Sequence, residues 1–269
     1  MHPMLNIAIA ASRNAGKIIL QAVDRLDSIS VTQKKGHDLV TEVDIKAERA
    51  IIQTIQKAYP NHGILAEESG KTNGNDYTWI IDPLDGTTNF IHGFPHFCVS
   101  IALAYKNKLE QAVIYDPIRQ ELFTASRGNG AQLNNRRIRV STRKNLTGAL
   151  IGTGFPFKDP QYLASYLKTF HAFSIPSAGI RRAGSAALDL AYVAAGRLDG
   201  FWEFNLNPWD LAAGSLLIKE AGGLVSNFEG VEIDFQTSNI VAGNGKVFKE
   251  MLQTISKSLN PSTTSSTVT

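Results

Sequence analysis

The sequence has very little cysteine, which limits the classes of protein it can belong to. Cys98 is the only cysteine among 269 residues. No disulfide can therefore form within the chain, and a reducing compartment such as the cytoplasm is expected. Cys98 lies in "FCVSIALAY", an apolar run typical of a buried strand. A catalytic thiol is disfavoured, because no residue beside it would activate the sulfur.

Long apolar runs and strong net charge are also absent. No stretch reaches the roughly eighteen apolar residues of a membrane-spanning helix, and the first twenty residues lack the basic start of a signal peptide. The formal net charge of +3 is too small to predict binding to nucleic acid. A local basic cluster, residues 136–144, is more typical of a solvated strand edge than of a polyanion contact. We expect no membrane association.

The residues that are present describe a globular chain in two halves. Hydrophobic residues make up 43% and charged residues 19%, the proportions of an ordinary folded protein. Residues 1–140 combine two helices, expected near 4–26 and after Thr41, with a meander of strands, which predicts an α+β half. Residues 141–259 alternate strands and helices, which predicts an α/β half. The Ser- and Thr-rich residues 260–269 are expected to be a frayed tail.

The segment "WIIDPLDGTTNF", residues 79–90, carries the strongest functional signal. An apolar strand ends at Asp82 and Asp85, and Gly86 and Thr87 follow. If a helical turn begins at Thr87, its free N–H groups would face an anion. Two carboxylates would repel a phosphate unless cations lay between them, and Mg²⁺ suits a set of oxygen ligands. The alternative is a tight turn in which Asp and Gly serve only the turn geometry.

Other acidic positions raise the same question, and each has a structural alternative. Glu67 and Glu68 follow the strand "GILA" and could lie in a solvated loop. Asp210 could cap a helix, and Asp44 could complete a capping box with Thr41. Spacing cannot show that these residues meet. If four carboxylates met at about 5 Å, they would repel by about 3 kcal/mol per pair, on the order of 20 kcal/mol in all. Protons or two to three divalent cations would have to offset this.

Four segments together resemble the inositol monophosphatase family. They are "GILAEES", "WIIDPLDGTTNF", "AGSAALDLAYVAAGRLDGFWE" and "NPWDLAAGSLLIKEAGG", and the resemblance spans residues 4–251. It is similar above all to the bacterial inositol-1-monophosphatase branch, which includes an extragenic suppressor protein that also acts in transcription antitermination. The resemblance implies an α-β-α-β-α layered sandwich, as in fructose-1,6-bisphosphatase, a homodimer, and a Mg²⁺-dependent, lithium-sensitive phosphomonoesterase.

The resemblance also implies roles for individual residues. Five positions would supply metal ligands: Glu67, Asp82, the Leu84 carbonyl, Asp85 and Asp210. Thr87 and Glu67 would orient the attacking water, and Asp44 would polarise Thr87. Gly86 and Thr87 would bind the phosphate group of the substrate. Four positions would contact its alcohol part: Asp85, Gly184, Ala186 and Glu203. Glu68 would support the site, and either Lys34 or Lys35 would supply the lysine of a mobile loop.

The predicted reaction is hydrolysis of inositol 1-phosphate to inositol and phosphate by in-line attack of water. No histidine is needed as a nucleophile, and His92 and His96 are expected to be ordinary surface or core residues. Other substrates with the same chemistry stay open, namely fructose 1,6-bisphosphate, a nucleotide 3′-phosphate or histidinol phosphate. Glu203 favours a polyol, because a carboxylate accepts hydrogen bonds from hydroxyls. A contact with the transcription machinery, alongside catalysis or instead of it, is the alternative of a different class, with residues 136–144 as a candidate surface. A purely structural dimer module is disfavoured.

Overall fold

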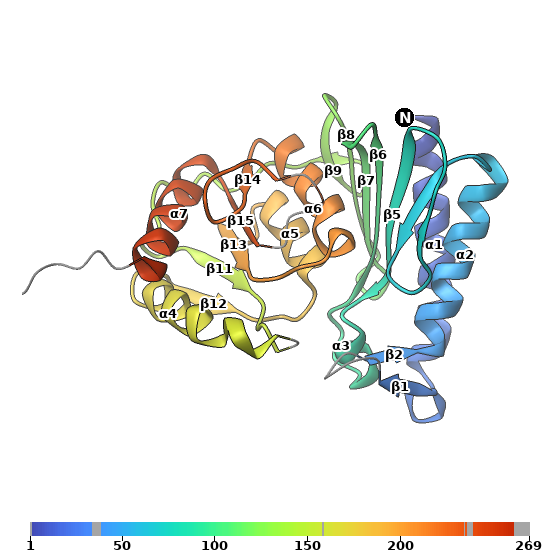
Figure 1. The fold of residues 1–269 in the computed structure, drawn as a ribbon, viewed down its shortest axis with the longest axis horizontal. Helices are drawn as coiled ribbons and strands as arrows, with labels where there is room; N and C mark the ends of the chain where they lie inside the picture. Colours follow the sequence, from blue (N-terminus) through green and yellow to red (C-terminus); the bar gives the residue numbers. More distant parts are fainter. Residues whose placement is uncertain (1, 34–38, 158, 234, 236–238, 261–269) are drawn as a thin grey trace, which may run out of the picture.

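The protein folds into five layers, with two sheets separated and flanked by pairs of helices (Figure 1). The computed structural model describes residues 2–33, 39–157, 159–233, 235 and 239–260. The order α-β-α-β-α agrees with the sequence-based prediction. Lys34, Lys35 and residues 261–269 lie outside the described part. The proposed division at residue 140 stays a prediction.

The larger sheet has eight strands in the order β10-β9-β8-β7-β6-β5-β3-β4. Its strands are β3 (Gly63–Ala66), β4 (Gly70–Thr72), β5 (Tyr77–Asp85), β6 (Cys98–Tyr105), β7 (Lys108–Asp116), β8 (Glu121–Ser126), β9 (Gly130–Leu133) and β10 (Arg136–Arg137). Only the β3–β5 pair is parallel, because the other neighbours follow one another as an antiparallel meander. Cys98 is fully buried in β6, as predicted. The basic cluster begins in the edge strand β10, where Arg136 and Arg137 are exposed, and continues beyond the strand.

Helices α1 (Pro3–Val23) and α2 (Glu42–Ala58) cover the outer face of this sheet (Figure 1). Alanines at spacings of three and four, such as Ala8, Ala11 and Ala15, are buried in α1 and let it pack closely against α2. The prediction that this helix reaches residue 26 was wrong by three residues. The chain leaves α1 at Val23 and forms a short 3₁₀ turn, Leu26–Ser28. Two short antiparallel strands that the sequence analysis did not predict, β1 (Val31–Gln33) and β2 (Leu39–Thr41), precede α2.

The smaller sheet has five strands in the order β12-β11-β13-β15-β14. Its strands are β11 (Leu150–Thr153), β12 (Gly179–Arg181), β13 (Gly200–Glu203), β14 (Leu224–Ser226) and β15 (Ile240–Gly243). Helices α4 (Leu163–Ser174), preceded by the 3₁₀ turn Pro160–Tyr162, and α7 (Gly245–Leu259) cover its outer face (Figure 1). The sequence analysis did not predict α7. Val247, Met251 and Ile255 form its buried face at a spacing of four, so the signal was present.

Helices α5 (Ala186–Ala194) and α6 (Pro208–Glu220) form the middle layer and contact both sheets. α5 is rich in alanine and α6 carries Ala212, Ala213 and Gly214, and these small residues let one helix pair fill the space between two sheets. One core cluster runs from β6 and β7 through these helices to β13 and β15. Gly196 follows α5 with a φ of 70°, the conformation in which glycine commonly ends a helix. The apolar face "ALDLAYVAA" is part of the core.

Gly214 makes close packing of the two central helices possible and gives a test of it. A methyl group at this position would overlap the Leu190 side chain of α5. We expect Gly214→Ala to lower the free energy of unfolding by about 1–3 kcal/mol, because overpacking outweighs the helix propensity of Ala. Urea unfolding would measure it. Gly245→Ala is the matched control, since its methyl would meet its nearest neighbour at 3.8 Å. Equal stability of both variants would contradict this packing.

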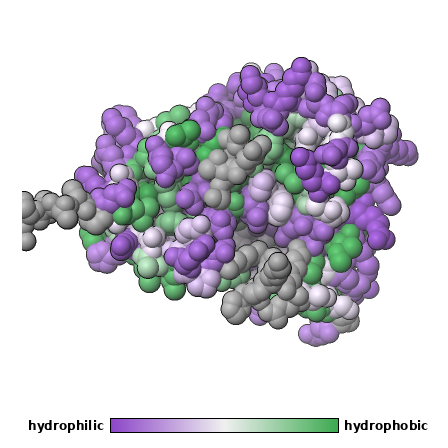
Figure 2. Space-filling view, in the orientation of Figure 1, coloured by the Kyte–Doolittle hydropathy of each residue, from purple (hydrophilic) through white to green (hydrophobic). Residues whose placement is uncertain are grey.

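The exterior differs between the two ends of the molecule. Figure 2 shows mainly polar residues over the end that carries α1 and α2, with more apolar residues over the end that carries α4 and α7. Leu163, Leu167 and Ile175, at and after α4, are exposed. Among the described residues, no helix combines the length and apolar character needed to cross a membrane.

Candidate active site

The parallel pair β3–β5 brings the first two acidic positions together. Ala66 is the register partner of Ile81, and the Glu67 N–H donates to the Ile81 carbonyl at 3.2 Å. Glu67 and Asp82 therefore leave adjacent strands at the same end. β5 is irregular between Asp82 and Asp85, where its register with β6 shifts. This local distortion carries the Asp-Pro-Leu-Asp segment out of the regular ladder and toward the cavity.

Three carboxylates, two from β5 and one from the distant helix α6, form the centre of the site. Oxygens of Asp82, Asp85 and Asp210 all lie within 4.8 Å of one another. Burial raises the pKa of Asp82 well above its usual value, and the charges of Glu67, Asp85 and Asp210 raise it further. A cluster of this kind attracts protons or cations strongly.

Asp210 both caps a helix and belongs to this cluster. It is the third residue of α6, and its Oδ2 accepts the Asn207 N–H at 2.7 Å in a capping box. The helix-cap interpretation from the sequence is therefore correct. It does not exclude the site interpretation, because the capped helix start is what places the carboxylate beside Asp82.

Thr87 lies at the start of the short helix α3 (Thr87–Ile91) and contacts α2. Gly86 caps this helix with a φ of 99°, a conformation that glycine adopts easily. The Thr87 Oγ1 lies 2.9 Å from Asp44 Oδ1 and 3.1 Å from the Leu84 carbonyl oxygen. Asp44 Oδ2 accepts the Thr41 N–H at 2.8 Å, which confirms the capping box. Asp44 therefore fixes its own helix with one oxygen and Thr87 with the other.

A buried glutamate holds the turn that carries Glu67 and Glu68. Glu48 is 3% exposed and accepts the N–H groups of Glu68 and Ser69, each at 2.8 Å. It lies one helical turn after Asp44, so both carboxylates face the site from α2. Sequence analysis did not single out Glu48, although its spacing of four from Asp44 was a usable signal.

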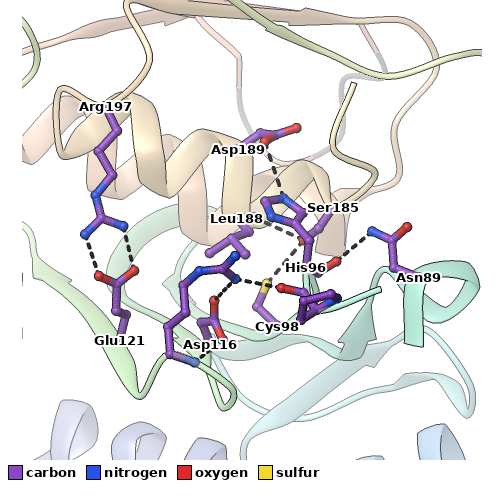
Figure 3. Close-up of polar contacts among 11 residues, drawn as sticks. Asn89, His96, Cys98, Asp116, Glu121, Ser185, Leu188, Asp189 and Arg197 are labelled. Atoms are coloured by element: carbon purple, nitrogen blue, oxygen red, sulfur yellow. Dashed lines mark hydrogen bonds and ion pairs between the residues drawn. The ribbon is translucent and has the colours of Figure 1, made fainter. Parts of the chain in front are cut away.

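The start of α5 is joined to the metal-ligand candidate Asp85. Its Oδ2 accepts the Ser185 hydroxyl and the Ala187 N–H, each at 2.7 Å. Ser185 Oγ also lies 3.5 Å from the buried Cys98 Sγ (Figure 3). Burial raises the pKa of Cys98 well above its usual value, which agrees with the prediction that this thiol is not a nucleophile. The contacts of Asp85 tie the two halves of the chain together at the cavity.

A cavity of about 330 Å³ opens between these elements. Ten of the predicted site residues line it: Glu67, Asp82, Leu84, Asp85, Gly86, Thr87, Gly184, Ala186, Glu203 and Asp210. Asp44 lies behind it and reaches it through Thr87. The structure therefore brings together all of these residues, while their individual roles stay predictions. His92 is exposed and His96 is buried, as expected of surface and core residues.

Several cavity residues were missed by the sequence analysis: Gly154, Phe155, Phe157, Arg182, Ser185 and Asp189. Gly154 matters because a methyl group there would overlap the Glu203 carboxylate. Burial raises the pKa of Glu203 well above its usual value, and Asp210, Asp189 and Asp85 add to this. Asp189 had a signal in the sequence, since it is the single charge in the apolar helix "AALDLAYVA".

Solved structures share this layered fold along nearly the whole chain. A crystal structure of the extragenic suppressor protein suhB from Bartonella henselae has a TM-score of 0.92 at 44% identity, covering 95% of this chain and 99% of that one. The inositol monophosphatase from Anabaena (Nostoc) sp. has a TM-score of 0.84 at 38% identity, covering 94% and 95%. The layers and the acidic cavity thus define the structural class, that of the inositol monophosphatases.

Comparison of sequences leads to the same class. The Inositol monophosphatase family profile matches residues 1–260, and the chain belongs to this family. A relative named Nus factor SuhB, from Pseudomonas aeruginosa, is 59% identical over 268 residues, which cover 97% of this chain and 99% of the relative. The resemblance seen in the motifs is confirmed, and membership in this family supports a phosphatase.

Proposed function

We propose that this protein hydrolyses a phosphate monoester, inositol 1-phosphate above all, with Mg²⁺ as its cofactor. The observation that carries the proposal is the cluster of Asp82, Asp85 and Asp210, whose oxygens lie within 4.8 Å at the wall of the cavity. Asp210 caps α6 and Asp85 holds the start of α5, but neither role requires three carboxylates this close together, and their mutual repulsion is a cost to the fold. The cluster is explained if cations and a phosphate occupy the space in front of it.

The donor set fits Mg²⁺, which prefers carboxylate, carbonyl and water oxygens. The proposed ligands are Glu67, Asp82, the Leu84 carbonyl, Asp85 and Asp210, for two to three ions. Bound Mg²⁺ would supply Lewis-acid chemistry, polarising the phosphoryl group and making water a better nucleophile at neutral pH.

The residues of the chain supply position and direction. The Thr87 hydroxyl donates to Asp44, so its oxygen can accept a hydrogen bond from the attacking water and relay the water's proton to Asp44. Glu67 would hold the same water from the end of the neighbouring strand β3. The N–H groups of Gly86 and Thr87 would bind phosphate oxygens. Water attacks phosphorus as the alcohol oxygen leaves on the opposite side, so that one ester and one water give one alcohol and one phosphate.

The alcohol would lie against Asp85, Gly184, Ala186 and Glu203, where carboxylates can accept hydrogen bonds from hydroxyls.

Phosphate release should be measured with inositol 1-phosphate, fructose 1,6-bisphosphate, a nucleotide 3′-phosphate and histidinol phosphate, each with Mg²⁺ and with EDTA. We expect kcat/KM to be highest for inositol 1-phosphate and activity to be lost in EDTA. The proposal fails if none of these esters releases phosphate with Mg²⁺ present.

Mg²⁺ is also expected to stabilise the fold. At about one hundred times its Kd, a ligand bound only by the folded state adds about 2.7 kcal/mol. For a chain of this size that corresponds to a rise in Tm of roughly 5–10 °C. Thermal unfolding with MgCl₂, against NaCl at equal ionic strength, would measure the difference. A Tm that responds equally to both salts would contradict a specific cation site.

A second function is suggested by the relative named Nus factor SuhB, at 59% identity. We propose that this chain also contacts the transcription machinery, with exposed residues of the basic cluster 136–144 as the candidate surface. Purified RNA polymerase and its elongation factors should be tested for binding to the parent and to Asp82→Asn. Equal binding by both would show that the contact does not depend on catalysis, and no binding would exclude it. We also propose that the protein is a cytoplasmic homodimer and that lithium inhibits its phosphatase activity.

A further inference from the structure

Asp189 is a buried carboxylate in the cavity wall to which sequence analysis gave no role. It is 2% exposed, although it lines the cavity. It lies on α5, the helix whose first turn binds Asp85 through Ser185 and Ala187. Glu203 lines the same cavity, and its charge and that of Asp189 influence one another.

The partners of Asp189 do not satisfy its oxygens. In the part of the chain that the structure describes, its nearest polar partner is His96, with Nε2 3.6 Å from Asp189 Oδ1. Figure 3 shows the His96 ring pointing toward the carboxylate from the segment that follows α3. The distance is longer than an ordinary hydrogen bond. The buried His96 Nε2 itself has no hydrogen-bond partner among the described residues.

A buried carboxylate without donors is costly, so such groups normally have hydrogen-bond partners. Burial raises the pKa of Asp189 to about 6, while His96 lowers it. Arg182 lines the same cavity and its charge lowers the pKa of Asp189 and of Glu203, but among the described residues it makes no hydrogen bond to either carboxylate, so the missing donors would come from the cavity side. A hydroxyl is the matching group, since it donates to a carboxylate and brings no charge into an acidic wall.

We propose that Asp189, held from behind by His96, binds a hydroxyl of the substrate alcohol and selects monoesters of polyols. The inference rests on the proposed phosphatase function and names the specificity of the same site. Asp189 is the residue in contact with the alcohol, and His96 is a positioning residue that acts through it. Asp189 and Glu203 together form a cavity wall that binds a polyhydroxylated ring.

The test compares two esters that differ in hydroxyl groups. Inositol 1-phosphate offers ring hydroxyls, whereas p-nitrophenyl phosphate offers none. In Asp189→Leu we expect kcat/KM for inositol 1-phosphate to fall about 10- to 100-fold, the value of a hydrogen bond to a charged group. The value for p-nitrophenyl phosphate should change less than about threefold. An equal fall for both esters, or no fall for either, overturns the inference.

Asp189→Asn keeps the shape of the side chain and one acceptor oxygen, so it is the variant to use if the leucine variant does not fold. We expect an intermediate loss that is again confined to inositol 1-phosphate. Binding of inositol alone, measured by calorimetry with Mg²⁺ and phosphate present, provides a readout without turnover. It should weaken in both variants, and unchanged binding would overturn the inference.

Two His96 variants test the positioning role. His96→Phe should lower the ratio of kcat/KM for the two esters in the same direction as Asp189→Leu, and His96→Gln, which keeps a donor, should restore it. The control is His62→Phe. His62 is a buried histidine that does not line the cavity, and its Nδ1 accepts the Trp79 indole N–H at 3.0 Å. An unchanged ratio in His96→Phe removes His96 from the proposal. If the parent hydrolyses neither ester and none of the other phosphate esters named above, the proposed function fails. If the parent is active and the ratio is constant in all the variants, only this inference fails.

Discussion

Replacing Asp82 by Asn is expected to lower the Mg²⁺-dependent release of phosphate from inositol 1-phosphate by at least about 10³-fold. The reason is the loss of a shared anionic ligand from the cluster with Asp85 and Asp210. Metal ions contribute several kcal/mol of transition-state stabilisation, and each 1.4 kcal/mol is about tenfold in rate. Initial rates over a range of Mg²⁺ concentrations would measure the loss and show whether more Mg²⁺ restores activity.

The same substitution should not harm the metal-free fold. Burial and three neighbouring acids raise the pKa of Asp82, so a neutral amide of the same shape removes repulsion. We therefore expect the Tm of Asp82→Asn in EDTA to equal or exceed that of the parent, and its rise with MgCl₂ to be smaller. Asp76→Asn is the control, because Asp76 is exposed and pairs with Lys106. Full activity of Asp82→Asn would end the metal-site proposal.

Asp44→Asn is expected to lower kcat by about 10²- to 10⁴-fold, the usual contribution of a positioned proton acceptor. Asp44 accepts from Thr87 with one oxygen and from Thr41 with the other. An amide can accept on only one side, so its NH₂ group would face either Thr87 or the Thr41 N–H. The capping box would weaken by about 1 kcal/mol, which is small beside the effect on kcat. Steady-state kinetics and urea unfolding would separate the two effects.

Two further variants show whether Asp44 acts through Thr87. Glu42→Gln changes an exposed acid on the same helix that pairs with Lys46, and its kcat should be unchanged. If Asp44 works only by orienting Thr87, the double variant Asp44→Asn with Thr87→Val should be no slower than Thr87→Val alone. Additive losses in the double variant would show that Asp44 has a separate role.

The fold was predictable to the extent that local patterns decide it. The meander from β6 to β9 and the caps of α2 and α6 follow from alternating apolar residues, turn residues and capping boxes, and all of them are found. The layer order came from the family resemblance, because no local pattern shows which face of a sheet a helix covers. The end of α1 was misjudged and the strands β1 and β2 were not predicted, since both features depend on tertiary contacts more than on propensity.

The sequence by itself determined the chemical content of the site: acids, threonines and glycines at strand ends and helix starts. Whether an acid serves as a helix cap or a site residue could not be decided there, and for Asp44 and Asp210 the structure shows a cap that also faces the site. Only the tertiary structure placed Glu67 beside Asp82 and brought Asp210 to them. The pairing of β3 with β5 sets the first distance and the packing of α6 against the sheet sets the second, and local sequence decides neither. The tertiary structure also showed that Asp189 and Glu48 are buried, because the packing of whole helices decides their burial, whereas the sequence offered only spacing and apolar neighbours as signals.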